Sequence, residues 1–141
     1  MVAYLDSSLA LRHMLRGEMT ISQALACDRT VSSELMEIEC RRVIQRCRLQ
    51  GELDDEGVLK ATERLEKLLN GMYLLSLSSA VKKRAMEAFP VSIKTLDALH
   101  LASALVLAEK SGGEKPLIFS HDTGMNRCAK VLGFQAPLAE E

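Results

Sequence analysis

Four acidic residues have the chemical type and the placement to bind a metal ion: Asp6, Glu39, Asp97 and Asp122. Asp6 and Asp122 each follow a short apolar run, whereas Asp97 interrupts an otherwise apolar helix. A carboxylate in such a place is costly to bury unless it is paired or binds a metal. Two like charges about 4 Å apart cost about 4 kcal/mol at an effective dielectric constant of about 20. A hard divalent cation such as Mg²⁺ or Mn²⁺ offsets that cost and prefers oxygen ligands.

Three of these acids have a purely structural alternative at the start of a helix. Asp6 and Asp122 could serve only as N-caps of the helices that follow them. Asp97 lies near a helix N-terminus, where the helix macrodipole favours an anion. Thr95 is already available as the cap of that helix, so the sequence favours a functional role for Asp97.

Glu39 is the weakest of the four signals when it is taken alone. It lies on the shoulder of the buried face of an amphipathic helix, and its structural alternative is an ion pair with Arg42 or Arg46. His100 stands one helical turn after Asp97. We interpret His100 as a packed core histidine rather than a ligand.

Alternating strands and helices must bring these residues together. We expect strands at 2–5, 29–31, 72–75 and 117–120, with an edge strand at 135–138. We expect helices at about 9–16, 34–49, 54–69, 78–88, 96–109 and 123–131. This order predicts an α/β fold with a short central parallel sheet flanked by helices on both faces. Open sheets of this kind place their sites at the carboxyl ends of the strands, where Asp6 and Asp122 stand.

The composition is that of one globular domain. The 141 residues are 48% hydrophobic and 26% charged, and we expect one domain over 1–138 with a frayed end at 139–141. The net charge of −1 excludes a uniformly basic protein that coats DNA without sequence preference.

Cysteine spacing and hydropathy indicate a cytoplasmic location. The four cysteines form no closely spaced pair, which favours reduced thiols that pack in the core over a zinc site. No signal peptide is expected, because the chain begins without a basic region and reaches Asp6 almost at once. The apolar stretch 96–108 is too short to span a bilayer, so we expect no association with a membrane.

Four blocks of the sequence, in order and at matching spacing, resemble the PIN-domain family. Each block carries one of the four acids, and the blocks cover 4–10, 31–42, 96–104 and 119–122 continued by 129–134. The most specific match is the third block, which reads Leu96-Asp97-Ala98-Leu99-His100-Leu101-Ala102-Ser103-Ala104. Within the family, the chain is most similar to the VapC-type toxins of bacterial toxin–antitoxin pairs.

The resemblance implies a Mg²⁺- or Mn²⁺-dependent endoribonuclease that cuts single-stranded or looped RNA. It implies that Asp6, Asp97 and Asp122 bind the metal ion, and that Glu39 completes the set of ligands or acts as a general base. A metal-bound water would then attack the phosphate, without a nucleophilic side chain.

The resemblance also implies supporting residues and protein partners. Ser8 and Ser120 would donate hydrogen bonds behind the metal ligands. Asn126 stands where some relatives carry a further acid, so a second metal ion would be weakly held. The toxin-like members are inhibited by a small antitoxin protein that covers the acidic pocket, and they usually form homodimers.

Basic helix faces are candidates for contact with RNA phosphates, and the alternative is that they are solvated surfaces paired with Glu. The candidates are Arg41, Arg42, Arg46, Arg48, Lys82, Lys83 and Arg84. No aromatic residues are interleaved among them to provide a platform for base stacking. We therefore expect RNA recognition through shape and phosphate contacts.

Two other classes of protein remain as alternatives. A PIN-like module without catalytic activity would bind RNA or a protein partner and would not cut. A phosphotransfer domain is a weaker alternative, because a haloacid-dehalogenase-type phosphatase needs Asp where Ser8 stands, and a receiver domain needs an acid that is missing from 72–75. An HD-type phosphohydrolase would need more histidines than the three present.

Overall fold

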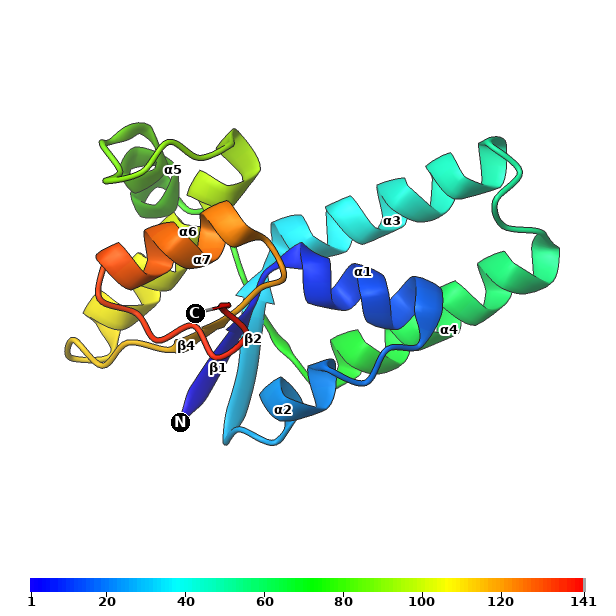
Figure 1. The fold of residues 1–141 in the computed structure, drawn as a ribbon, viewed down its shortest axis with the longest axis horizontal. Coiled ribbons are helices and arrows are strands. Elements are labelled where there is room, and N and C mark those ends of the chain that lie inside the picture. The colour runs from blue at the N-terminus through cyan, green and yellow to red at the C-terminus, as the bar shows by residue number, and fades with distance from the viewer. Residues whose placement is uncertain (141) are drawn as a thin grey trace.

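The computed structural model describes residues 1–140 as alternating strands and helices (Figure 1). The strands are β1 (Val2–Leu5), β2 (Arg29–Ser33), β3 (Tyr73–Leu75) and β4 (Leu117–Phe119). The helices are α1 (Ser7–Arg16), α2 (Ile21–Leu25), α3 (Glu34–Leu49), α4 (Asp55–Asn70), α5 (Ser79–Met86), α6 (Thr95–Lys110) and α7 (Thr123–Val131). Among the described residues, no helix has both the length and the apolar character needed to cross a membrane.

The sheet is parallel throughout, with the strand order β3-β2-β1-β4. Tyr4 on β1 pairs with Val31 on β2 and Ile118 on β4. Because all strands point the same way, their carboxyl ends meet at one edge of the sheet, where Asp6 follows β1. The predicted α/β fold with a central parallel sheet is confirmed.

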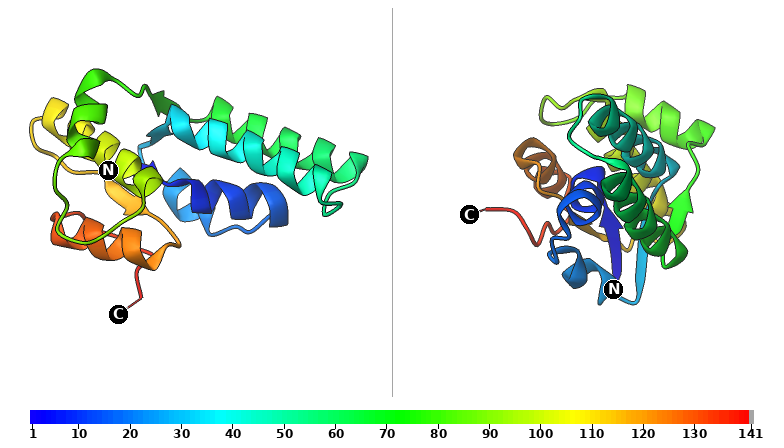
Figure 2. Two further views of the ribbon diagram at one scale, coloured as in Figure 1. Left: turned by 90° about the horizontal axis from the view of Figure 1, so that it is seen from above. Right: turned by 90° about the vertical axis from the view of Figure 1, so that its right-hand side faces the viewer.

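Helices cover both faces of the sheet, because successive side chains on a strand point to opposite faces. Ala3 and Leu5 lie in a core cluster with residues of α1, α3 and α4, among them Leu65. Tyr4 lies in a second cluster, which includes Leu101 of α6 and residues of α7. Figures 1 and 2 show these two helical layers, with α5 packed against α6 and far from the tip of the α3–α4 pair. Asp97 is brought to the sheet edge because α6 is so fully buried.

Helices α3 and α4 run side by side and extend well beyond the sheet (Figures 1 and 2). Arg41 of α3 joins them, since its guanidinium donates to Glu37 at 2.7 Å and to Glu66 of α4 at 2.9 Å. Cys40 and Cys47 lie buried on the same side of α3, as their spacing of one heptad predicts. All four cysteines are free thiols.

Two local predictions are wrong. The segment 135–138 forms no strand, although the carbonyl of Gln135 accepts one hydrogen bond from the amide of Ile118 at 2.9 Å. Thr95 does not cap α6, because the helix begins one residue earlier than expected: Lys94 is the N-cap and makes no side-chain capping bond. Asp97 is therefore the only acidic side chain in the first turn of α6.

The domain limits stay a prediction. Residues 139 and 140 lie in neither a helix nor a strand. Residue 141, the last of the segment predicted to fray, lies outside the described residues.

Candidate functional site

Asp6 is a buried carboxylate, only 4% exposed, that joins β1 to α1. Its Oδ1 accepts hydrogen bonds from the amide of Ser8 at 2.9 Å and from the Ser8 hydroxyl, so Asp6 does cap α1. Its Oδ2 accepts from the hydroxyl of Ser120 at 2.5 Å. Burial nonetheless raises the pKa of Asp6, because these donors only partly replace the lost hydration. Both predicted supporting serines therefore bond directly to this acid.

Asp122 is linked to Asp6 through Ser120. The Ser120 hydroxyl that donates to Asp6 also accepts from the amide of Asp122 at 2.9 Å. Asp122 Oδ1 accepts from the amide of Met125 at 2.8 Å and so caps α7. Among the described residues, the side chain of Asn126 makes no hydrogen bond to an acid: its Nδ2 donates to the Ser120 carbonyl at 3.0 Å, and its buried Oδ1 has no partner.

Asp97 is a half-buried carboxylate that faces Asp122 and Asp6. Burial and the negative charges of these two acids raise its pKa from 3.8 to about 6. Asp97 and Asp122 line one pocket of about 250 Å³ together with Lys94, which is a nearby positive charge. The structure thus brings three of the four acids into mutual electrostatic repulsion.

This repulsion predicts a pH-dependent stability for the metal-free protein. Since folding raises the pKa of Asp97, its contribution to stability is complete below about pH 4 and is lost as the pH rises through about 6. Solvent screens the charge at this half-buried site, so the shift should change the free energy of unfolding by only about 1 kcal/mol. In EDTA, Asp97→Asn should therefore unfold at a higher temperature than the wild type at pH 7, with the difference vanishing near pH 4. A difference that does not change with pH would contradict this prediction.

Glu39 is anchored on the other side of Asp6 by a buried histidine. Its Oε1 accepts from the Ser7 hydroxyl at 2.5 Å and lies 2.9 Å from Nε2 of His100. The Nδ1 of His100 in turn lies 2.8 Å from the hydroxyl of Tyr4. The tautomer with hydrogen on Nε2 satisfies both contacts, with Tyr4 as the donor to Nδ1. Burial raises the pKa of Tyr4, which keeps its hydroxyl protonated.

The contacts of Glu39 test two predictions, its ion pair with an arginine of the same helix and the core position of His100. Glu39 makes no ion pair with Arg42 or Arg46 among residues 1–140, so the structural alternative for Glu39 is wrong. His100 is packed in the core as expected, at 2% exposure, but it also contacts the acid of the site. Sequence reasoning did not single out Ser7, and its position beside Asp6 was the only signal that could have identified it.

The donor set suits a hard divalent cation. Every candidate ligand offers carboxylate oxygens, which Mg²⁺ and Mn²⁺ prefer, and the raised pKa of Asp97 shows negative charge that is not compensated. Within the described chain, however, no three His, Cys, Asp or Glu side chains lie close enough together to form a ready metal site. A cation would therefore have to draw the carboxylates of Asp6, Asp97 and Asp122 closer together, while hydrogen bonds hold those of Asp6 and Asp122 in place.

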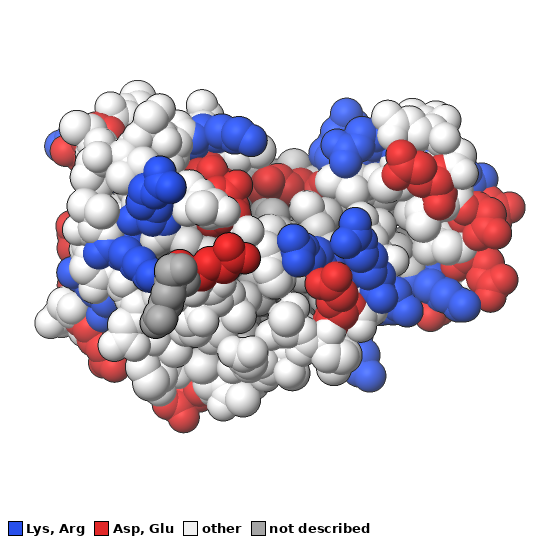
Figure 3. Space-filling view, viewed as in Figure 1, with Lys and Arg blue, Asp and Glu red and all other residues white. Residues whose placement is uncertain are grey.

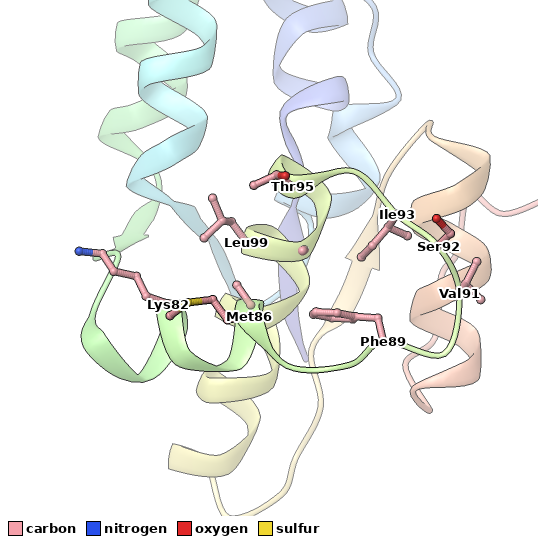
Figure 4. Close-up of a pocket in the computed structure, with 10 residues that line it drawn as sticks. Lys82, Met86, Phe89, Val91, Ser92, Ile93, Thr95 and Leu99 are labelled. Carbon is pink, nitrogen blue, oxygen red and sulfur yellow. The ribbon is translucent and has the colours of Figure 1, made fainter.

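An apolar groove of about 750 Å³ adjoins the acidic pocket. Figure 4 shows Met86 on α5, Leu99 on α6, and Phe89 and Ile93 on the loop between them around the same space. Ile93 also lines the acidic pocket, so the groove and the acidic pocket are neighbours. Met86 is 81% exposed, which marks this groove as a surface able to bind an apolar partner.

Some of the basic side chains that were candidates for contact with RNA phosphates form ion pairs within the protein. Arg41 binds Glu37 and Glu66, and Arg48 binds Asp55 at 2.5 Å, so these two arginines serve the α3–α4 pair. Arg84 stacks on the ring of Phe89, with its guanidinium carbon 4.6 Å from the ring centroid. In Figure 3, acidic side chains lie in the depression near the upper centre of the view, and basic side chains flank it on both sides.

Comparisons with known proteins agree with this fold. A family model described as PIN domain matches residues 3–131. The fold is also similar to that of a chain in the crystal structure of VapBC2 from Rickettsia felis bound to a DNA fragment from their promoter. That match has a TM-score of 0.67 and 10% sequence identity, and it covers 96% of this chain and 97% of the other. At this identity the likeness shows the fold alone. A comparison with curated proteins found no match.

Proposed function

The chain belongs to the PIN-domain family, and we propose that it is a Mg²⁺- or Mn²⁺-dependent endoribonuclease that hydrolyses phosphodiester bonds of RNA. The observation that carries this proposal is the placement of three acids at one edge of the sheet: Asp97 and Asp122 line one pocket, and the Ser120 hydroxyl joins Asp122 to Asp6. The raised pKa of Asp97, caused by burial and by the charges of Asp122 and Asp6, agrees with this placement. Carboxylates that repel one another at the carboxyl edge of a parallel sheet are typical of a cation site rather than of a structural network.

Each acid then has a separate task. Asp6, Asp97 and Asp122 would hold the ion, with Ser8 and Ser120 orienting Asp6 through the hydrogen bonds that they already donate. When bound, the cation supplies positive charge that lowers the pKa of a water molecule and offsets the charge of the phosphate.

Glu39 is suited to accept a proton. Ser7 and His100 both contact its Oε1, and no hydrogen bond from the described residues reaches its Oε2. The free oxygen is therefore available to a water molecule or to a ligand of the ion, while the bonds to Oε1 fix its direction. This arrangement supports either of the two roles that the family resemblance implies for Glu39.

The test is cleavage of a structured RNA pool by the full-length protein, with Mg²⁺ or Mn²⁺ against EDTA. We expect cutting with either ion, none in EDTA, and recovery when the ion is added back. We also expect Mn²⁺ to raise the unfolding temperature, because a ligand that binds only the native state stabilises it. Equal cutting with and without EDTA would refute the proposal.

A binding module without catalytic activity is the second candidate, and one observation favours it: the described side chains form no ready metal site. That function predicts RNA binding with no cutting at any Mn²⁺ concentration and no metal-dependent rise in unfolding temperature. The family match over 3–131 gives no support to a phosphatase or receiver domain.

The partner that we propose is a small antitoxin, with the protein acting as the toxin of a pair. The apolar groove supports this, since it shares Ser92 and Ile93 with the acidic pocket and presents the exposed side chain of Met86 beside those of Phe89 and Leu99. A bound antitoxin segment would bury these side chains and block the acids. A homodimer is proposed on the family resemblance alone, and light scattering of the purified protein tests it. A cytoplasmic location is proposed on the cysteine spacing and the hydropathy of the sequence.

A further inference from the structure

A second polar pocket, of about 320 Å³, is lined by the chain neighbours of Asp122 and is separate from the acidic pocket and the apolar groove. Its walls come from α1, the β4–α7 connection, α7 and the C-terminal segment. The lining residues are Arg12, His121, Thr123, Asn126, Arg127, Lys130, Leu138, Ala139 and Glu140.

The charge of this basic pocket is predominantly positive. Arg12, Arg127 and Lys130 face a single carboxylate, that of Glu140. Arg127 and Lys130 are exposed and form no ion pair within residues 1–140, and they stand three residues apart on one face of α7. Arg12 forms a long ion pair with Glu18, at 3.8 Å. Arg127 and Lys130 are therefore free to bind an anion, and Arg12 adds a positive charge that Glu18 partly offsets.

The basic pocket also contains a neutral hydrogen-bond donor, and hydrogen bonds fix the position of one lining residue, His121. Thr123 contributes a hydroxyl at the first residue of α7. His121 is held from both sides, since its amide donates to the Ser8 hydroxyl at 2.9 Å and its Nε2 lies 3.3 Å from the Thr20 hydroxyl.

The basic pocket and the acidic pocket share one short turn of the chain. His121 and Thr123 line the basic pocket, whereas Asp122 and Gly124 line the acidic pocket. An anion bound in one therefore lies next to a cation bound in the other. A polyanion that spans both would place a phosphate in each, which matches the repeating charge of a nucleic-acid strand.

We propose that the basic pocket binds a backbone phosphate of the RNA strand, adjacent to the phosphate that is cut. Arg12, Arg127 and Lys130 are the phosphate-binding residues, and Thr123 is a hydroxyl donor to the same group. This rests on the proposed function, because that function makes RNA the substrate. The basic pocket thus explains how a protein with a net charge of −1 and acids at its centre holds a polyanion.

The test measures RNA affinity apart from catalysis. Fluorescence anisotropy of a labelled single-stranded RNA is recorded in EDTA, with full-length Asp97→Asn as the background so that repulsion from the acids is reduced. We expect Arg127→Gln combined with Lys130→Gln to weaken binding about tenfold or more, as for the loss of charge-assisted hydrogen bonds. The slope of log affinity against log salt should fall by about 0.7, the value for one phosphate contact on a single strand.

Two further variants give the test its controls. Lys60→Gln with Lys67→Gln removes the same charge from the exposed face of α4, away from the basic pocket, and should leave affinity and slope nearly unchanged. Glu140→Gln removes the one carboxylate of the basic pocket and should raise affinity about twofold, the size of one exposed charge interaction. The substituted side chains are on the surface, so unfolding temperatures should stay close to that of the background.

The outcomes separate this proposal from the proposed function. RNA binding that depends on Arg127 and Lys130, together with a wild type that does not cut, would support the basic pocket and refute the nuclease. If the wild type cuts RNA but the double variants on α7 and α4 bind RNA with equal affinity, the nuclease is supported and the proposal for the basic pocket is refuted. The absence of RNA binding by the Asp97→Asn background would also overturn the proposal for the basic pocket.

Discussion

Replacement of Asp97 by Asn is expected to reduce metal-dependent RNA cleavage by more than about a hundredfold, because it removes a charged ligand from the centre of the acidic site. Asp97 is the acid that both Asp6 and Asp122 affect through their charge. The amide keeps the shape of the side chain but cannot supply the negative charge that holds the cation. The measurement is the initial rate of RNA cleavage over a series of Mn²⁺ concentrations.

The direction of the stability change shows whether Asp97→Asn loses activity because a ligand is missing or because the protein unfolds. The same variant should be more stable than the wild type in EDTA at pH 7, since it ends the repulsion among the three acids. Asp55→Asn is the control, because Asp55 also lies in the first turn of a helix but is exposed at the remote start of α4 (Figure 1). It should cut RNA at the wild-type rate and, since it loses the ion pair with Arg48, should not gain stability. A less stable Asp97→Asn protein, or one that cuts RNA at the wild-type rate, would contradict the role assigned to Asp97.

Replacement of His100 by Ala is expected to lower cleavage about 10- to 100-fold, the range typical for residues that orient a metal ligand. His100 joins Tyr4 to Glu39, and its loss leaves the hydroxyl of Ser7 as the remaining hydrogen-bond partner of Glu39 among the described residues. It also leaves the buried Tyr4 hydroxyl without this contact and creates a cavity, which should cost about 2–4 kcal/mol of stability. The Mn²⁺ concentration for half-maximal rate should rise if Glu39 helps to hold the ion.

Two comparisons distinguish the positioning of Glu39 from simple destabilisation. Tyr4→Phe removes the hydroxyl bonded to Nδ1 of His100 but leaves the contact of His100 with Glu39, so it should lower stability with little change in the Mn²⁺ requirement. His13→Ala is the matched histidine control, because His13 touches only the carbonyl of Glu18 at 3.3 Å. If Tyr4→Phe and His100→Ala shift the Mn²⁺ requirement equally, His100 acts through stability alone.

Local patterns in the sequence determined the elements and the places of three acids. Short apolar runs predict strands, and a parallel sheet collects the residues after its strands at one edge, so Asp6 and Asp122 could be assigned together. Asp97 was marked because a charge inside an apolar helix has no role in a purely structural core. The edge strand at 135–138 could not be judged in this way, because an edge depends on which neighbour the chain pairs with.

Only the tertiary structure decided which side chains meet across long separations in sequence. Glu39 contacts His100, 61 residues away, and not the arginines on its own helix. Arg41 binds Glu66 because α4 packs beside α3, so a helix face that looked available for RNA is occupied. Arg12 meets Arg127 only where α1 and α7 approach beneath the C-terminal segment. Periodicity assigns a residue to a face of its own element, but the identity of its partner depends on how elements pack, and no local pattern contains that information.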